Sequence, residues 1–308
     1  MVQLSVVIPC YFEEDVLPQT IERVSAAAEA EYPNNHEILY VDDGSRDSTW
    51  ELIQRAAGNN PAIRGIRLAR NFGHQAALTA GLVESRGEII LVIDADLQDP
   101  PELLGPMRKR LEEGFDVVYG KRKRRENETP FKQVTAKLFY WLINWLSDVP
   151  IPADTGDFRL MRRPVVEAFL AMKEQHRFVR GMVAWVGFEQ SPFEYDRPAR
   201  AAGETKYPLF KMVRFATDAV TSFSVKPLRL ASLGGLLGMG MAVVLAVYLL
   251  YSFAFLNVAP GWASLLAAVV FFGSAQLLTL GIIGEYLGRT YMESKQRPLY
   301  LISAKTSC

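Results

Sequence analysis

Short apolar stretches rich in β-branched residues recur through the amino-terminal part of the chain, with segments of helical periodicity between them. We expect strands at Leu4 to Ile8, Glu37 to Val41, Ile63 to Leu68, Glu88 to Ile93 and Asp116 to Tyr119. Strands that alternate with helices form a parallel sheet with helices on both faces. The pattern therefore predicts an α/β protein with a doubly wound, Rossmann-like, mostly parallel sheet.

A second pattern is a long apolar segment near the carboxyl end. Between Leu230 and Gly284 the chain has no Asp, Glu, Lys or Arg, and Asn257, Pro260 and Gly261 interrupt the segment near its middle. Each half exceeds the roughly 20 residues that a helix needs to cross a bilayer. We therefore expect a hairpin of two transmembrane helices, and not a buried hairpin in the core of a soluble protein.

Basic residues flank this segment on both sides. Lys226 and Arg229 precede it, whereas Arg289, Lys295 and Arg297 follow it, and the loop between the two halves carries no charge. Because positively charged flanks stay on the cytoplasmic side of a membrane, both ends of the hairpin are expected there. Glycines in the first half allow close helix contact, either within the hairpin or between the subunits of a homo-oligomer.

The predicted elements divide the chain into four parts: a cytoplasmic α/β domain at 1–206, an interfacial amphipathic helix at 207–228, the transmembrane helices at 229–290 and a cytoplasmic tail at 291–308. A second amphipathic segment is expected at 131–146. Both amphipathic segments place basic residues beside an apolar face, which favours the lipid headgroup layer. The same faces could instead cover the sheet.

Charge is distributed unevenly although it cancels overall, with 34 basic and 34 acidic residues. The segment 197–229 holds seven bases and two acids, so it is expected to face an anionic partner. The two cysteines, Cys10 and Cys308, do not form a disulfide framework, and the three histidines are too widely separated along the sequence to indicate a metal cluster.

Acidic residues follow two of the predicted strands. Asp94 and Asp96 come directly after Ile89 to Ile93, and their oxygens suit Mg²⁺ or Mn²⁺ when a diphosphate supplies further ligands. Asp42 and Asp43 follow the second strand, where an acid could accept hydrogen bonds from a base or ribose. Both groups also fit simple turn and helix-cap chemistry. Because the carboxyl ends of parallel strands meet at one edge, we expect a ligand site there.

These residues belong to a longer set of ordered motifs. The set resembles the GT-A glycosyltransferases of family 2, and within them the branch of dolichol-phosphate mannose synthases and bactoprenol glucosyltransferases. The resemblance covers nearly the whole chain, including the two apolar halves. Its motifs are Val6-Val7-Ile8-Pro9 with Tyr11 and Glu13, Val41-Asp42-Asp43-Gly44-Ser45, Asn71-Phe72-Gly73, Asp94-Ala95-Asp96-Leu97-Gln98-Asp99-Pro100-Pro101, Thr155-Gly156-Asp157-Phe158-Arg159-Leu160 and Gly203-Glu204-Thr205-Lys206-Tyr207.

The resemblance implies transfer of a hexose, most commonly glucose from UDP-glucose, to polyprenyl (undecaprenyl) phosphate at the cytoplasmic face of a bacterial membrane. GDP-mannose, UDP-N-acetylglucosamine and a UDP-aminoarabinose derivative are alternative donors. A phosphomonoester loses its second proton near pH 6, so the acceptor needs no strong base. We expect one in-line attack that inverts the anomeric configuration of the sugar.

The resemblance also implies roles for single residues. The nucleotide-sugar would meet Pro9, Tyr11, Glu13, Asp42, Asp43, Asp94, Gln98 and Arg122. The divalent metal would meet Asp94, Asp96 and Gln98, and the acceptor phosphate would meet Lys132, Lys137, Arg200 and Lys206. The catalytic residues would be Asp96 and Asp157, with Asp157 orienting the acceptor or taking a residual proton. An ion pair with Arg159 or Arg162 is the structural alternative for Asp157. The family often has a serine where Thr155 stands here.

Three other interpretations fit the sequence less well. A processive polysaccharide synthase would carry a Q-x-x-R-W motif and more spans, and this chain has neither. A non-catalytic membrane scaffold would not need the intact acidic motifs. The basic run Lys121 to Arg125 could bind nucleic acid, but two spans would hold it at a lipid surface, so we expect no nucleic-acid partner.

Overall fold

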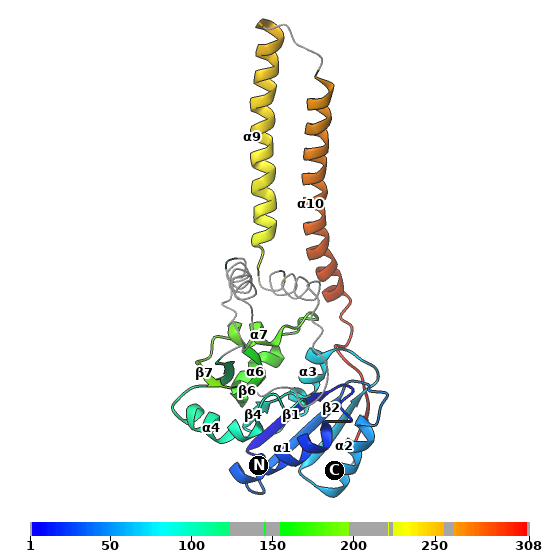
Figure 1. Ribbon diagram of the computed structural model, residues 1–308, viewed down its shortest axis with the longest axis vertical. Coiled ribbons are helices and arrows are strands. Elements are labelled where there is room, and N and C mark those ends of the chain that lie inside the picture. Colours follow the sequence, from blue (N-terminus) through cyan, green and yellow to red (C-terminus); the bar gives the residue numbers. More distant parts are fainter. Residues whose placement is uncertain are drawn as a thin grey trace.

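The computed structural model describes residues 2–123, 145, 155–196, 221, 224–255 and 261–306. In this part of the chain an α/β domain carries two long helices that extend away from it (Figure 1). The amphipathic segments predicted at 131–146 and 207–228 lie almost wholly outside the described residues.

Within the described residues the strands form one sheet in the order β7-β5-β6-β4-β1-β2-β3-β8. The centre is parallel, because β1 pairs with β2 and β4, and β2 pairs with β3, all in parallel register. The five predicted strands are β1 to β5, so the α/β class is confirmed. The bounds are β1 (Leu4–Cys10), β2 (His36–Asp42), β3 (Ile63–Leu68), β4 (Ile89–Val92), β5 (Val117–Arg122), β6 (Thr155–Arg162), β7 (Gln190–Tyr195) and β8 (Ile302–Lys305).

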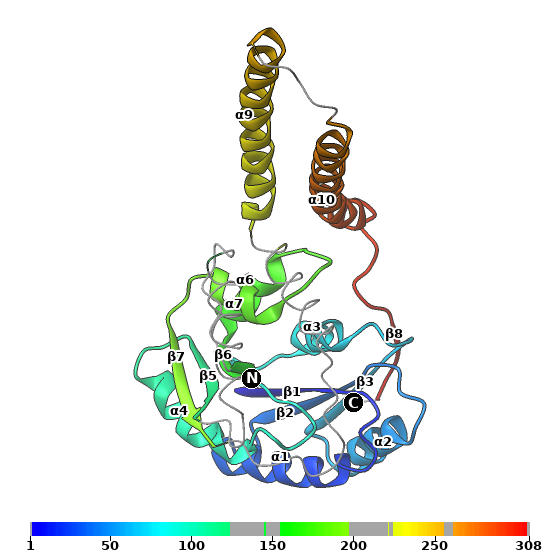
Figure 2. The ribbon, with the colours of Figure 1, turned by 45° about the horizontal axis from the view of Figure 1, so that its top comes forward.

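Helices cover both faces of the sheet (Figure 2). On one face lie α1 (Leu17–Glu31), α2 (Thr49–Asn59), the 3-10 helix Pro101–Leu103 and α4 (Leu104–Glu112), and on the other lie α3 (His74–Glu84), α6 (Arg163–Ala171) and α7 (Val179–Trp185). Side chains alternate along each strand. In β1, for example, Val6 and Ile8 join the first layer of the core and Val7 the second.

Strand β6 runs against its neighbours and brings a distant part of the chain to the ligand edge. It lies between β4 and β5 and pairs with both in antiparallel register, with Val92 opposite Arg159. Asp157, two residues before Arg159, therefore lies beyond the carboxyl end of β4, where Asp94 and Asp96 follow. Asp157 belongs to one of the family motifs, but the sequence pattern does not predict this strand.

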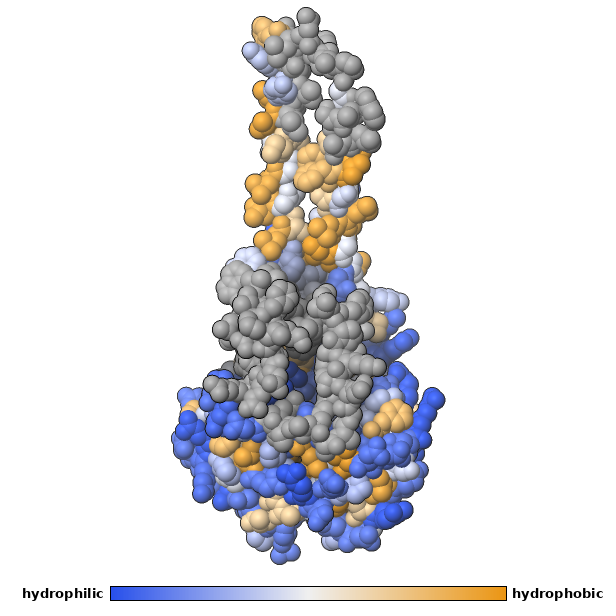
Figure 3. All heavy atoms as spheres, viewed as in Figure 1, coloured by the Kyte–Doolittle hydropathy of each residue, from blue (hydrophilic) through white to orange (hydrophobic). Residues whose placement is uncertain are grey.

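The two long helices are α9 (Lys226–Phe255) and α10 (Trp262–Ser294). Their segments Lys226–Val244 and Ala268–Ser294 are long and apolar enough to cross a membrane, and neither is buried against the rest of the protein. Apolar side chains cover their exposed surface (Figure 3). A core helix of a soluble protein would be buried, and a signal sequence would lie at the amino terminus, so membrane spans fit these helices better.

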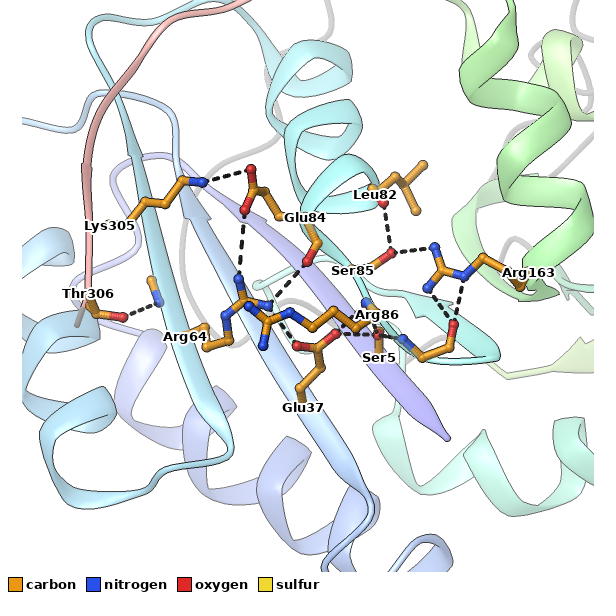
Figure 4. A network of polar contacts seen from close by, with 12 residues as sticks. Ser5, Glu37, Arg64, Leu82, Glu84, Ser85, Arg86, Arg163, Lys305 and Thr306 are labelled. Atoms are coloured by element: carbon orange, nitrogen blue, oxygen red, sulfur yellow. Dashed lines mark hydrogen bonds and ion pairs between the residues drawn. The ribbon is translucent and has the colours of Figure 1, made fainter. Parts of the chain in front are cut away.

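After α10 the chain returns to the sheet. Strand β8 pairs with β3 in antiparallel register and covers its open edge. Beside it, Lys305 Nζ lies 2.8 Å from Glu84 Oε1, and Glu84 also contacts Arg64, which pairs with the buried Glu37 at 2.7 Å (Figure 4). Both ends of the α9–α10 hairpin therefore connect to the same domain. The sequence does not predict this strand within 291–308.

Candidate active site

A cavity of about 230 Å³ lies at the carboxyl ends of β1, β2, β3 and β4. This is the edge at which the sequence analysis expected a ligand. The lining residues come from the last residues of β1, from the segments that follow the four strands and from the first turn of α3. They are Pro9, Cys10, Tyr11, Glu13, Asp43, Asn71, His74, Ala77, Asp94, Ala95 and Asp96.

Asp43 shapes one wall of the cavity by holding the loop before α3. Its Oδ1 accepts a hydrogen bond from the Phe72 amide at 2.7 Å, and its Oδ2 accepts one from the Gly73 amide at 2.9 Å. Gly73 has a φ of 98°, a conformation that favours glycine. Gly44 packs against the same loop, since a Cβ there would lie 2.6 Å from the Arg70 carbonyl carbon. The loops after β2 and β3 thus form one rigid wall.

Asp42, by contrast, does not line the cavity. It is fully buried, it lies 3.2 Å from Arg67 Nε, and its Oδ1 accepts a hydrogen bond from the Ser45 amide at 2.9 Å. The Ser45 hydroxyl in turn accepts a hydrogen bond from the Phe12 amide at 3.1 Å. These contacts fit the turn chemistry that the sequence analysis left open for this motif.

Asp94 and Asp96 both reach the cavity. Asp94 Oδ1 is buried, accepts no hydrogen bond from the described residues, and lies 3.7 Å from His74 Nε2. Burial raises the pKa of Asp94 to about 6, partly opposed by His74. A buried carboxylate oxygen without a donor fits a cation ligand. Within the described residues no group of three or more His, Cys, Asp and Glu side chains could hold a metal by itself, so ligand oxygens would have to complete the shell.

Gln98 and Arg122, which the resemblance assigned to the donor, are not among the residues that line the cavity. The backbone amide of Gln98 donates a hydrogen bond to Asp96 Oδ1 at 3.1 Å, and Gln98 is buried. Arg122 stands at the end of β5, where a Cβ on Gly156 would come 3.5 Å from its Nη2. Tyr195 lies beside it and donates a hydrogen bond from its hydroxyl to Asp99.

Asp157 is 5% exposed and is held by donors from two helices. His74 Nε2 lies 3.1 Å and Gln75 Nε2 3.2 Å from its Oδ2, and Arg180 Nε lies 3.1 Å from its Oδ1. His74 and Gln75 open α3, whereas Arg180 belongs to the first turn of α7. The carboxylate therefore joins β6, α3 and α7 beside the cavity.

The two ion-pair partners considered for Asp157 from the sequence behave differently. Arg159 Nη2 lies 3.7 Å from Asp157 Oδ1, and the same guanidinium donates hydrogen bonds to the carbonyls of Gly156 and Asp157. Arg162 instead lies 3.9 Å from Asp116. Of the two ion pairs named for Asp157, the described residues contain the one with Arg159, whereas Arg162 pairs with Asp116.

Charge around Asp157 keeps it ionised. Burial would raise the pKa of Asp157, but Arg180, the hydrogen bond from His74, and Arg159 outweigh it and hold that pKa well below its usual value. Burial would lower the pKa of His74, but Asp157 and Asp94 together raise it to about 9. Asp157 is consequently a poor proton acceptor, and its geometry suits the orientation of His74 and Arg180.

The residues that sequence reasoning missed are His74, Gln75 and Arg180. The position of His74 could have been inferred from the sequence, because it follows Gly73 in the segment after the strand predicted at 63–68, where ligand-binding residues are expected. Arg180 had none, since its contact with Asp157 joins segments 23 residues apart. The predicted acceptor-phosphate residues Lys132, Lys137, Arg200 and Lys206 lie outside the described residues.

Comparison with known proteins gives a consistent result. The profile of Glycosyl transferase family 2 matches residues 5–170. The chain is 46% identical over 302 residues to the uncharacterized glycosyltransferase YkcC of Bacillus subtilis (strain 168), covering 98% of this chain and 93% of YkcC. It is 36% identical to the bactoprenol glucosyl transferase of Shigella phage SfX, covering 98% and 99% of the two chains.

Among solved structures, one similar chain is glucosyl-3-phosphoglycerate synthase from Mycobacterium tuberculosis in complex with Mn²⁺, UDP and glucosyl-3-phosphoglycerate. The TM-score is 0.47 at 19% sequence identity, and the match covers 71% of this chain and 78% of the synthase.

Proposed function

Because the chain belongs to Glycosyl transferase family 2, we propose that it transfers a sugar from a nucleotide diphosphate donor to the phosphate of a polyprenyl lipid. The observation that carries this proposal is the position of Asp94 and Asp96 in a cavity of a domain that also bears two unburied apolar helices. Such a protein can meet a water-soluble donor and a lipid acceptor at one membrane surface. The name of the phage relative supports bactoprenol as the lipid and glucose as the sugar.

The donor would lie over the carboxyl ends of the central strands. Pro9, Tyr11, Glu13 and Asp43 line the part of the cavity formed by β1 and β2, which suits the nucleoside. Asp94 and Asp96 would hold a divalent cation, Mg²⁺ or Mn²⁺, with the donor diphosphate. When bound, the cation supplies positive charge that offsets the charge of the leaving nucleotide diphosphate.

The acceptor phosphate is already ionised near neutral pH, so the site has to position it and stabilise charge more than remove a proton. Asp157 fits this role, because its low pKa makes it a weak base. Its two oxygens hold Arg180 and His74, and His74 lines the cavity. The proposed reaction is a single in-line displacement with inversion, because an ionised acceptor phosphate can attack the anomeric carbon directly and needs no covalent intermediate on the enzyme. A product with retained configuration would contradict this mechanism.

We further propose that the α/β domain and both ends of the α9–α10 hairpin lie on the cytoplasmic side of a bacterial inner membrane. The basic residues that flank the hairpin support this orientation. Strand β8 supports it too, because it returns the chain after α10 to the sheet that contains β1. The catalytic cavity and the membrane would then share one side.

The test is a panel of donors offered to the full-length protein in lipid. UDP-glucose, UDP-N-acetylglucosamine, GDP-mannose and a UDP-aminoarabinose derivative are each incubated with radiolabelled undecaprenyl phosphate, with and without a chelator. We expect a sugar-bearing lipid from UDP-glucose, lost on chelation and restored by Mn²⁺ or Mg²⁺. Binding of donor without product from any member of the panel would favour the non-catalytic scaffold.

The pKa of Asp94 predicts how metal binding depends on pH. A metal ligand must be deprotonated, and burial raises the pKa of this carboxyl to about 6. Lowering the pH through 6 protonates it, so the affinity for Mn²⁺ in the presence of UDP should fall roughly tenfold per pH unit below that point. Calorimetric titration between pH 5 and pH 8 checks this. In the Asp94→Asn variant this dependence should be shallower, because only the UDP phosphate then titrates in this range. Equal pH dependence in the variant and the wild-type protein would count against Asp94 as a ligand.

A further inference from the structure

Gln75 connects two elements that meet beside the cavity. Its Oε1 accepts a hydrogen bond from the Val179 amide at 3.0 Å, and its Nε2 donates one to Asp157 Oδ2 at 3.2 Å. A backbone amide can only donate and an ionised carboxylate can only accept, so a single orientation of the Gln75 amide satisfies both. Gln75 is not among the residues that line the cavity.

Asp157 depends on such donors because it is buried and charged. A buried carboxylate is costly unless hydrogen bonds and opposite charges compensate it. Gln75 supplies a neutral hydrogen bond on the same oxygen that His74 contacts, and His74 Nε2 in turn lies 3.7 Å from Asp94 Oδ1. A shift of Asp157 would therefore move His74 relative to the proposed metal ligand.

The start of α7 is fixed from two directions. On the side of the sheet, Gln75 Oε1 accepts a hydrogen bond from the backbone amide of Val179, the first residue of α7. On the side of α10, the backbone amide of Gln175 donates to Glu293 Oε1 at 2.7 Å. The side-chain Nε2 of Gln175 donates to the backbone carbonyl of Arg297, also at 2.7 Å. The segment between α6 and α7 is thus held between the end of α10 and Gln75.

We propose that Gln75 is a positioning residue for sugar transfer. It holds Asp157, and through Asp157 it keeps His74 beside Asp94. It also fixes the first turn of α7, which carries Arg180 to the other oxygen of Asp157. The inference rests on the proposed function, since it concerns the site that would perform that reaction.

The test is the Gln75→Met variant, which has a side chain of similar length without either hydrogen bond. We expect kcat to fall roughly 10- to 100-fold, which is the usual loss when a residue that orients a metal-binding side chain is replaced. The KM for the nucleotide-sugar should change less than about twofold, because Gln75 does not line the cavity and the nucleoside-side residues Pro9, Tyr11 and Asp43 do not depend on it. A second variant, Gln75→Glu, places a carboxylate against Asp157. Its activity relative to wild type should recover as the pH falls, because the protonated side chain can donate again.

A matched control exists at the other end of α7. Gln190 Nε2 donates to the Val183 carbonyl at 2.9 Å, so Gln190→Met removes a similar bond without touching Asp157. We expect this variant to keep the wild-type kcat. Equal losses in the two methionine variants, or a wild-type kcat in Gln75→Met, would overturn the positioning role.

Hydrogen–deuterium exchange separates this inference from the proposed function. Loss of the Gln75 acceptor should speed exchange of the amides in the first turn of α7, whether or not the protein is turning over. If the wild-type protein makes no sugar-bearing lipid from any donor, the proposed function fails. If exchange in α7 is unaltered by Gln75→Met, the positioning role fails by itself.

Discussion

Replacement of Asp94 or Asp96 by asparagine is expected to lower sugar transfer by about a thousandfold or more, with no loss of folded protein. A divalent cation stabilises the leaving diphosphate by several kcal/mol, and each 1.36 kcal/mol changes the rate about tenfold. Asparagine keeps the shape and one oxygen of the side chain but loses the negative charge that the cation needs. Initial rates with UDP-glucose and undecaprenyl phosphate measure the loss.

Stability should distinguish this effect from misfolding. Burial raises the pKa of Asp94 to about 6. Above that pH the carboxyl is charged in both states, and the charge lowers the stability of the folded protein relative to the unfolded one. Removing the charge costs the fold little, and the thermal midpoint of Asp94→Asn at pH 8 should equal or exceed that of the wild-type protein. Asp116→Asn, an acidic residue away from the cavity, serves as the matched control and should keep full activity. Wild-type rates in both Asp94→Asn and Asp96→Asn would refute the metal-assisted mechanism.

The sequence predicts those residues of the site that directly follow an apolar strand, because their position depends only on the local pattern of apolar and polar residues. Strands β1 to β4 are short apolar runs, and polar residues follow each of them, so the sequence alone places Tyr11, Asp43 and Asp94 at one edge of the sheet. The adjacent pair Asp42 and Asp43 shows the limit of this reasoning. The motif cannot say which carboxylate faces the ligand, and the twofold alternation of the strand buries Asp42 against Arg67.

Strand β6 shows why other parts could not be predicted. Its sequence, Thr155–Arg162, contains Asp157, Arg159 and Arg162, and most of these positions are buried. Charged residues argue against a central strand when each is considered alone. They are tolerated here because partners from elsewhere compensate them, such as Arg180 for Asp157 and backbone carbonyls for Arg159. Such partners come from folding and leave no periodic signal.

Strand β8 could not be predicted from the sequence for a related reason. Its removal is expected to lower both the stability of the protein and its affinity for UDP. The strand has four residues and follows an apolar helix, so no alternating pattern marks it. It nevertheless pairs with Ile66, Arg67 and Leu68, and the Ala69 amide donates to the Leu301 carbonyl at 2.8 Å. These contacts fix the end of β3, which leads directly into the loop that Asp43 holds and then to His74.

Deletion of residues 299–308 should therefore lower stability and loosen the site together. Several backbone hydrogen bonds at roughly 1 kcal/mol each, and the contact of Ile302 with the core, would be lost, so we expect a net loss of about 3 kcal/mol. For a domain of this size that corresponds to a midpoint roughly 10 °C lower. The end of β3 would also be freed, so the affinity for UDP should weaken. Thermal unfolding and UDP titration of the detergent-solubilised protein measure the two effects.

The control for this deletion is Lys305→Met, which keeps the strand and removes only its ion pair with Glu84. That lysine side chain is 47% exposed, and an exposed pair contributes at most about 1 kcal/mol, so the control should unfold within roughly 3 °C of the wild-type protein. The deletion leaves α10 and the contacts of Glu293 and Arg297 in place, so a lower midpoint reports on the sheet and not on the hairpin. An unchanged midpoint with full UDP affinity would mean that β3 needs no partner at its outer edge.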